Sequence, residues 1–402
     1  MNLVIFDDDS RVDFYPLTLT RCIGDLRCGV LKLRQRLESL FDHEECQYII
    51  DPELQDLYRE RHPDWSINNV KTGDTLLVNS RLKLIPPVIE QIRSLKMGEK
   101  LVSPLGIIAL RTTTVPECYA SLLLLCKNTE GEIWIEDNAL YQNLAQIIHS
   151  NAQMIDYDFE HFFEDEENYQ ETEPGVTLLN PYGIWIGEGC TLKPGVILDA
   201  SEGKIIIDND VKIMANAVIM GPAYIGKCST IKVGAKIYPG TSIGPVCKIG
   251  GEVEGSIFQA YSNKQHEGFI GHSYIGEWVN IGADTNNSDL KNTYKNVLYY
   301  SFRTRAKVDS GTMFLGTMIG DHVKLGINCT INTGTVIGTG SNLWGADLIS
   351  DYIPPFSWGS GSEHTNYRLD AFLQTLRLVK ERRSLALGKA EEELFYLLHH
   401  AF

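Results

Sequence analysis

The chain has 402 residues and a formal net charge of −16 at pH 7. The length allows two or three domains, each with its own core. The strong negative charge argues against general binding to nucleic acids or anionic membranes, because phosphate groups would meet a repelling field.

Cysteine spacing and the N-terminus bear on the cellular compartment. The nine cysteines include no C-x-x-C pair, so neither a zinc ribbon nor a redox motif is indicated. The run Asp7–Asp9 has the wrong charge for a signal peptide, and no apolar run approaches the roughly 18 residues that span a bilayer. We expect a cytoplasmic protein that acts on small molecules and binds neither nucleic acid nor membrane.

Strands alternate with helices over residues 1–162. The hydrophobic pattern predicts strands at 2–6, 46–50 and 75–78, and helices at 29–41, 52–61, 87–95, 116–126 and 138–161. This alternation indicates a doubly wound α/β domain with a mostly parallel sheet and helices on both faces. Ligands bind at the carboxyl ends of the strands in such sheets, so the loop after the first strand is a candidate active site.

That loop carries Arg11 and then Pro16-Leu17-Thr18. It resembles the first motif of the sugar-phosphate nucleotidyltransferases, a glycine-rich loop that ends in arginine and continues with Pro-Leu-Thr. The glycines are replaced by Asp8 and Asp9, which we interpret as candidate Mg²⁺ ligands. The resemblance implies a cationic clamp on the nucleotide phosphates, for which the candidates are Arg11, Arg21, Arg27 and Lys32. The alternative is a polar loop whose arginines pair with neighbouring aspartates. Asn79 stands where the family usually has a metal-binding aspartate.

Residues 163–180 are acidic and indicate a solvated linker. Beyond it, isoleucine recurs at every sixth position from Ile207 to Ile249. A period of six matches neither a helix nor a plain strand, but it fits the hexapeptide repeat of a parallel β-helix. We predict this solenoid over 181–350, with the regular residues pointing inward. The inward set continues, after interruptions, at Ile257, Asn263, Phe269, Ile275, Ile281, Ile319, Leu325, Ile331, Ile337 and Leu343.

The C-terminal part, residues 351–402, is expected to form a helical tail. One helix places Leu369, Phe372 and Leu376 on a single face, and a second begins near Lys389. The exposed end of a solenoid needs a cap, so we expect this apolar face to pack across the end or side of the solenoid.

The segment 263–297 interrupts the repeat with many polar residues. It resembles the acetyltransferase half of the bifunctional enzymes that acetylate glucosamine 1-phosphate and then couple the product to UTP. The whole chain resembles an alternative bacterial branch of that family, in which the nucleotidyltransferase domain is shortened. The resemblance implies a left-handed β-helix, a homotrimer with the acyl site between subunits, and acetyl-CoA as co-substrate.

The resemblance also assigns roles to single residues. His266 takes the place of the general base, a role that suits a neutral imidazole. Asn280 matches a residue that contacts the sugar, and Asp289 stands where the family has an asparagine near the acetyl group. Lys295 matches a family lysine at the phosphate, and Lys264 and Lys291 are further candidates to hold this group.

Two departures leave the acceptor sugar open. Tyr238 and Glu254 stand, by register, where the family presents an arginine and a lysine to the sugar phosphate. Three alternatives also remain. The chain could retain only one of the two activities, or act as a non-catalytic trimeric scaffold that binds nucleotide sugars. His272 and His322 could instead belong to a zinc site of the kind found in other hexapeptide proteins.

Overall fold

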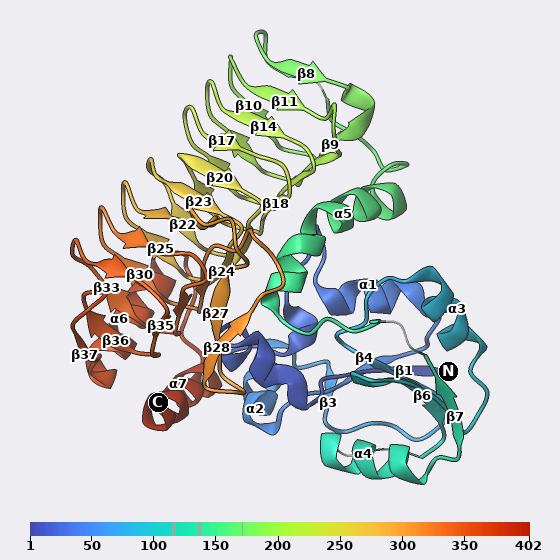
Figure 1. Ribbon diagram of the computed structural model, residues 1–402. Helices are drawn as coiled ribbons and strands as arrows, with labels where there is room; N and C mark the ends of the chain where they lie inside the picture. Colours follow the sequence, from blue (N-terminus) through green and yellow to red (C-terminus); the bar gives the residue numbers. More distant parts are fainter. Residues whose placement is uncertain (115, 117, 136–137, 171) are drawn as a thin grey trace.

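The computed structural model describes residues 1–402 except 115, 117, 136–137 and 171. It has an N-terminal α/β domain, a long β-helix and a helical C-terminal tail (Figure 1). The predicted fold class is confirmed in all three parts. The solenoid rises beside the α/β domain, and helix α5 (Leu144–Phe162) lies between the two.

The sheet of the α/β domain has seven strands in the order β3-β2-β1-β4-β6-β5-β7. The chain first adds strands on one side of β1 and then crosses to the other side, which is the doubly wound arrangement. The first four are parallel, whereas β6 runs antiparallel to both neighbours. The strands are β1 (Asn2–Phe6), β2 (Cys46–Ile49), β3 (Ser66–Ile67), β4 (Thr75–Asn79), β5 (Glu99–Ser103), β6 (Gly106–Thr112) and β7 (Gly131–Trp134).

Helices cover both faces of this sheet, as predicted. Leu3 and Ile5 face one apolar layer with α1, α2 and α3, whereas Val4 and Phe6 face a second layer with α4. The alternation follows from the period of two along a strand. The helices are α1 (Leu33–Leu40), α2 (Gln55–Arg61, preceded by the 3-10 turn η4, Pro52–Leu54), α3 (Pro86–Ser94) and α4 (Tyr119–Asn128).

The solenoid has three walls. One wall contains β10 (Thr191–Leu192), β13 (Lys212–Ile213), β16 (Thr230–Ile231), β19 (Lys248–Ile249), β22 (Asn263–Lys264), β25 (Asn280–Ile281), β30 (Lys324–Leu325), β33 (Asn342–Leu343), β36 (Ser357–Gly359) and β37 (His364–Asn366). The second contains β9 (Ile184–Ile186), β12 (Ile205–Ile207), β15 (Ala223–Ile225), β18 (Thr241–Ile243), β21 (Ile257–Ala260), β24 (Tyr274–Glu277), β29 (Met318–Ile319), β32 (Val336–Ile337) and β35 (Tyr352–Ile353).

The third wall is formed by two shorter sheets. The first contains β8 (Thr177–Leu179), β11 (Ile197–Asp199), β14 (Val218–Met220), β17 (Lys236–Ile237), β20 (Glu252–Glu254) and β23 (Phe269–Gly271), and the second contains β26 (Asn286–Asn287), β31 (Thr330–Ile331) and β34 (Leu348–Ile349). A 3-10 turn, η5 (Pro181–Gly183), joins β8 to β9. Strands pair in parallel from coil to coil, as Ile205 does with Ala223 and Ala223 with Thr241.

The predicted inward stack is correct over Ile207–Ile249 and wrong in the next coil. There the residues that point inward are Phe258, Lys264 and Ile270, instead of their chain neighbours Ile257, Asn263 and Phe269. The register shifts because this coil is shorter than the ones before it. The inward residues that follow Ile249 are Val253 and Phe258, so the spacing between them falls below the regular six residues. The stack is regular again at Ile275 and Ile281, and at Ile319 beyond the insertion.

The C-terminal tail contacts more than the solenoid. Its helices α6 (Leu369–Glu381) and α7 (Lys389–Ala401) share an apolar cluster with the α/β domain, in which Leu376 and Phe395 lie with Leu57 of α2. A buried ion pair, Lys380 with Glu391, joins the two helices. The expected packing on the solenoid occurs too, since Lys380 lies over the ring of Trp278. The tail therefore holds both domains together.

A hairpin from the solenoid insertion, β27 (Leu298–Ser301) with β28 (Ala306–Asp309), reaches the α/β domain. Arg303 at its tip donates to the carboxylate of Asp13 at 2.8 Å.

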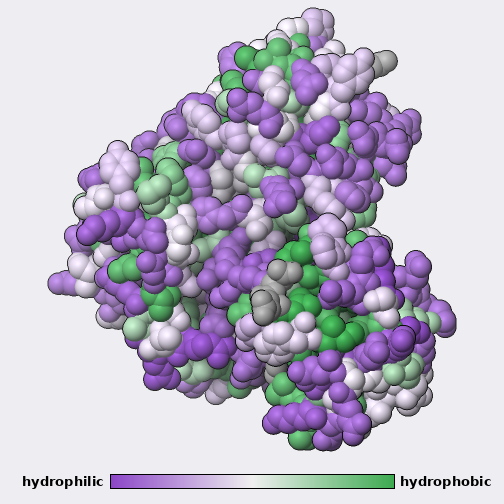
Figure 2. Space-filling model, turned by 45° about the vertical axis from the view of Figure 1, so that its right-hand side comes forward, coloured by the Kyte–Doolittle hydropathy of each residue, from purple (hydrophilic) through white to green (hydrophobic). Residues whose placement is uncertain are grey.

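Within the described residues, no helix combines the length and apolarity needed to cross a membrane. Figure 2 shows mainly hydrophilic residues on the face it presents, with hydrophobic ones gathered chiefly over the lower half.

Candidate functional site

The loop after β1 folds into three 3-10 helices, η1 (Asp9–Phe14), η2 (Leu17–Leu19) and η3 (Ile23–Asp25). It has no glycine-rich phosphate cradle. Asp8 accepts hydrogen bonds from the backbone N–H of Ser10 and from the amide of Asn79, at 3.0 Å and 2.9 Å. The guanidinium of Arg81, which is 2% exposed, forms an ion pair with the same carboxylate.

These contacts do not fit the predicted Mg²⁺ site. Both oxygens of Asp8 already accept protein donors, and the neighbouring Asp9 is exposed. Among the residues that the structure describes, no three His, Cys, Asp or Glu side chains lie close enough together to hold a metal ion. The zinc alternative meets the same objection: His322 is buried beside Trp278, and His272 is bonded to a carboxylate.

Two cations of the predicted phosphate clamp bind other groups of the protein. Arg11 is 5% exposed; it donates to the carbonyl of Thr18 at 2.8 Å and pairs with Asp51 at 2.5 Å. Lys32 pairs with Asp25 at 3.2 Å. The interpretation of the loop as arginines paired with aspartates thus describes this conformation better than a clamp does, although the partners lie farther along the chain than expected.

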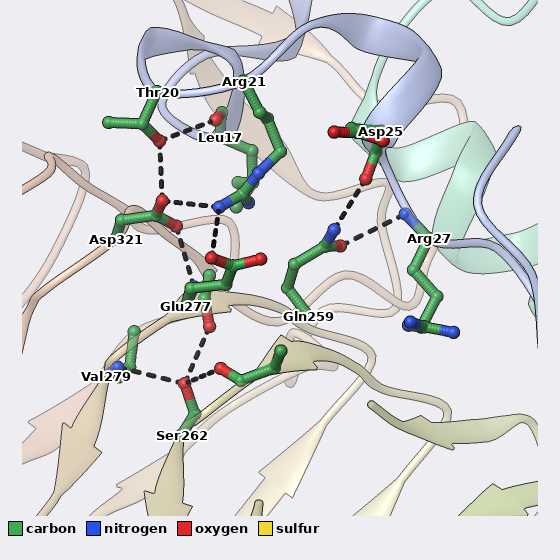
Figure 3. A network of polar contacts seen from close by, with 12 residues as sticks. Leu17, Thr20, Arg21, Asp25, Arg27, Gln259, Ser262, Glu277, Val279 and Asp321 are labelled. Atoms are coloured by element: carbon green, nitrogen blue, oxygen red, sulfur yellow. Dashed lines mark hydrogen bonds and ion pairs between the residues drawn. The ribbon is translucent and has the colours of Figure 1, made fainter. Parts of the chain in front are cut away.

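Arg21 and Arg27 lie at the interface between the α/β domain and the solenoid (Figure 3). Arg21 forms a 2.5 Å ion pair with Asp321 of the solenoid, and Glu277 lies 3.8 Å from the same nitrogen. The backbone N–H of Arg27 donates to Gln259 at 3.2 Å and to the hydroxyl of Tyr274 at 2.7 Å. Both arginines therefore hold the domains together in the structure described.

The residues predicted for acyl transfer lie on two walls of the solenoid. Asn280 is exposed on β25, while Tyr238 and Glu254 belong to the neighbouring wall, at β17 and β20. His266 is exposed in the turn between β22 and β23, where these walls meet. Lys295 is exposed on the insertion after β26. One chain therefore does not gather all these groups around a single point.

Asp289 is hydrogen-bonded to a second histidine, His272. Its carboxylate is 2.7 Å from Nδ1 of His272, whose ring packs near Phe314. A Cβ at Gly271 would stand 2.3 Å from Oδ2 of Asp289, so this pair requires glycine there. The predicted contact of Asp289 with the acetyl group stays a prediction, and the structure adds the hydrogen bond with His272.

Lys264 lies inside the coil, where its side chain takes the place of a repeat isoleucine. It is 1% exposed, and its ammonium donates to the carbonyls of Gly250 and His266, each at 2.9 Å. Removal from water lowers its pKa from 10.5 to about 8. The amine does not reach the surface here, so the structure does not support its predicted contact with substrate.

We predict a specific pH dependence of stability for this lysine. Between pH 8 and 10.5 the unfolded chain binds the proton that the folded chain has lost, so stability rises with pH in this window. The full rise is about 3 kcal/mol. The variant Lys264→Met should lack it, which urea titrations at pH 7.5 and 10 would reveal. Lys212→Met, at an exposed position of β13, is the control. Equal pH dependence in all three proteins would contradict the buried amine.

A cavity of about 300 Å³ lies beside the turn that carries His266. It opens on the wall that contains β19, β22, β25 and β30, and the end of α6 closes it on one side. Asn280 and Gln265 line it, together with Lys248, Tyr261, Asn263, Trp278, Lys324, Val379, Arg382 and Arg383. Of the predicted substrate residues, Asn280 is the one that this cavity includes.

Comparisons with known proteins identify a family model for the N-terminal part and several partial relatives. Residues 3–167 match a family model described as sugar nucleotidyl transferase. "Bifunctional protein GlmU" of Synechococcus sp. is 29% identical over 178 residues, which are 44% of this chain and 34% of that protein. A "Bifunctional sugar-1-phosphate nucleotidylyltransferase/acetyltransferase" of Sulfurisphaera tokodaii is 36% identical over 211 residues, 46% of this chain and 51% of that protein. The resemblance to GlmU-like proteins is therefore confirmed.

The match to these relatives is partial. The chain spans about a third to a half of the length of the curated relatives it matches. Among solved structures, a UDP-N-acetylglucosamine acyltransferase from Campylobacter jejuni covers 57% of this chain and 96% of its own at 13% identity, with a TM-score of 0.26. So low a score supports no conclusion about this chain.

Sequence reasoning missed four cations of the cavity: Lys248, Lys324, Arg382 and Arg383. The two lysines occupy the position just before an inward residue on their strands, which marks them as outward-facing but not as neighbours. The insertion after β26 separates them, and the arginines come from the tail. A register count that allowed for this insertion would have aligned the lysines.

Proposed function

We propose that the chain is an enzyme of nucleotide-sugar synthesis. Its solenoid would transfer acetyl from acetyl-CoA to the amine of an amino-sugar 1-phosphate, with glucosamine 1-phosphate as the first candidate. Its α/β domain would transfer a nucleotidyl group from UTP to the sugar 1-phosphate. The observation that supports the acyl step is the polar cavity beside the turn that carries His266. Asn280 and Gln265, the residue before His266, line this cavity, whereas His266 itself does not. The family match over 3–167 supports the nucleotidyl step.

The chemistry of the acyl step suits an exposed imidazole. The amine attacks the thioester carbonyl, a C–N bond forms, the C–S bond breaks and CoA leaves as a thiol. The attacking nitrogen must lose a proton, which a ring nitrogen of His266 accepts and then returns to the departing thiolate. Asn280, which lines the cavity, would bind a sugar hydroxyl through its amide.

The first test is release of thiol from acetyl-CoA with glucosamine 1-phosphate as acceptor. We expect turnover by the unchanged protein and a loss of about 10²–10⁴-fold in kcat in His266→Ala, the usual contribution of a general base. His43→Ala is the matched control, because that histidine lies in the α/β domain, far from the solenoid turn in sequence. Within the described residues, its ring is hydrogen-bonded to the backbone carbonyl of Phe41.

The possible outcomes separate the hypotheses. Equal loss in both histidine variants would point to general damage and remove His266 from the site. An absence of turnover with glucosamine 1-phosphate, but turnover with another amino-sugar phosphate, would fit the replacement of two cations by Tyr238 and Glu254. No binding of acetyl-CoA or of any nucleotide by calorimetry would leave the non-catalytic scaffold.

A second candidate function, acyl transfer alone, is favoured by one observation. The loop after β1 has its main charges satisfied internally, Asp8 by Arg81 and Arg11 by Asp51. Release of pyrophosphate from UTP with N-acetylglucosamine 1-phosphate would refute this candidate. The homotrimer and the cytoplasmic location belong to the same proposal, and sedimentation equilibrium would test the first of them.

A further inference from the structure

One row of side chains forms the floor of the cavity beside His266. On four successive strands of one wall, Lys248 pairs in register with Asn263, Asn263 with Asn280, and Asn280 with Lys324. Adjacent strands are about 4.8 Å apart, so the backbone positions of the two lysines are separated by about 14 Å. Two amides thus stand between two ammonium groups in a straight line.

The tail supplies the opposite side. Arg382 and Arg383 follow the last turn of α6 and line the same cavity. Arg383 donates to the side-chain oxygen of Asn263 at 3.1 Å, which positions its guanidinium over the row. Tyr261 and Trp278 stack on each other beside it, with ring centroids 4.4 Å apart. The negative end of a helix dipole attracts cations, which explains why two arginines stand at the end of α6. It does not explain the two lysines on the solenoid wall.

The four cations form no salt bridge with any residue that the structure describes. They are Lys248, Lys324, Arg382 and Arg383, and within the described parts of the chain no Asp or Glu lines their cavity. Burial, and then the neighbouring Arg383, lower the pKa of Lys248. Burial lowers the pKa of Lys324 to about 8 against the opposing effect of the Asp321 carboxylate, and the Lys324 ammonium donates to the backbone carbonyl of Trp278. Four cations around one cavity repel one another, so the arrangement is unfavourable unless an anion joins them.

We propose that this cavity binds the phosphate groups of a substrate, with Lys248 and Lys324 holding them from the solenoid and Arg382 and Arg383 closing over them from the tail. This inference rests on the proposed function and deepens it, because it assigns the phosphate to residues other than Lys264 and Lys295. Two substrates carry suitable groups, the nucleotide end of acetyl-CoA and the sugar 1-phosphate. The tail then acts as a binding element in addition to joining the domains.

The test is calorimetric binding to the full chain with two separate probes, 3′,5′-ADP for the nucleotide end of CoA and glucosamine 1-phosphate for the acceptor. We expect one of them to bind, and its affinity to fall at least tenfold in the double variant Arg382→Gln/Arg383→Gln and in Lys248→Gln. The affinity should also fall as salt is raised, because ions screen partly exposed charges. The probe that loses affinity identifies the substrate.

Lys389→Gln is the matched control, since it removes an exposed positive charge from the same tail outside the cavity. Unchanged binding in this control, with loss in the other variants, supports the site. Equal weakening in the control and the cavity variants, or no binding of either probe, would overturn it. Binding does not require turnover. If the cavity binds a probe but no amino-sugar phosphate gives thiol release, the proposed acyl transfer is refuted and this inference stands.

Discussion

Replacing Asp321 with alanine is expected to lower the free energy of unfolding by about 3–5 kcal/mol, the usual effect of removing one partner from a buried ion pair. Asp321 is 4% exposed and lies at the centre of the interface between the domains (Figure 3). Its carboxylate accepts from Arg21 at 2.5 Å, from the hydroxyl of Thr20 at 2.6 Å and from the backbone N–H of Glu277 at 2.7 Å. Without it, the Arg21 guanidinium would be buried with Glu277 as its remaining partner, 3.8 Å away.

Urea titration followed by tryptophan fluorescence and circular dichroism would measure this loss. The control is Glu173→Ala, which removes an exposed pair with Lys193 and should cost less than about 1 kcal/mol. The double variant Arg21→Met/Asp321→Leu should lose less than Asp321→Ala alone, because it removes the deeply buried guanidinium together with its closest carboxylate. Glu277 loses its salt bridge in this variant, but its side chain is 18% exposed and keeps some contact with water. If all three variants unfolded at the same urea concentration, the interface would not depend on this ion pair.

The solenoid was predictable because its signal is local. Each inward isoleucine from Ile207 to Ile249 repeats the same short strand and corner, and the stacking of coils requires no knowledge of distant residues. The prediction fails at Lys264, where a shortened corner moves the inward position by one residue. A one-residue slip exchanges inside for outside, so a lysine interpreted as a phosphate ligand becomes part of the core.

The arginines after β1 were misinterpreted for the opposite reason. Arg21 meets Asp321, which is 300 residues away in sequence, so its partner cannot be found from the loop itself. The sequence identifies such a group as cationic and leaves open whether a ligand or a distant carboxylate neutralises it.

The antiparallel strand β6 was missed as well, although Ile107–Leu110 is a continuous apolar run. This strand follows β5 through a tight turn and not through a helix. Alternation of strands and helices predicts parallel pairs only.

The second large effect is expected at Asp8, which the sequence paired with Asp9 as a metal ligand. In the structure the two differ sharply, since Asp8 is 8% exposed and bonded to Arg81 and Asn79, whereas Asp9 is exposed. Asp8→Ala would leave the guanidinium of Arg81 buried without an anion, so we expect a loss of about 3–5 kcal/mol in the free energy of unfolding. Asp9→Ala, one residue along the chain, should change it by less than about 0.5 kcal/mol.

Thermal and urea unfolding of the unchanged protein and the two variants, each with and without about 1 mM Mg²⁺ (roughly 10³ times a micromolar Kd), would separate the two interpretations. If Asp8 is chiefly a partner of Arg81, the metal should not stabilise the unchanged protein, and the stability loss should be confined to Asp8→Ala. A metal site built on both aspartates would give the reverse: Mg²⁺ would stabilise the unchanged protein, and each substitution would abolish that stabilisation. In that case Arg81 would have to release Asp8 when the metal binds. The comparison therefore decides whether this loop forms an ion site or a closed polar cluster, and with it whether nucleotidyl transfer here can use the metal that its resemblance implies.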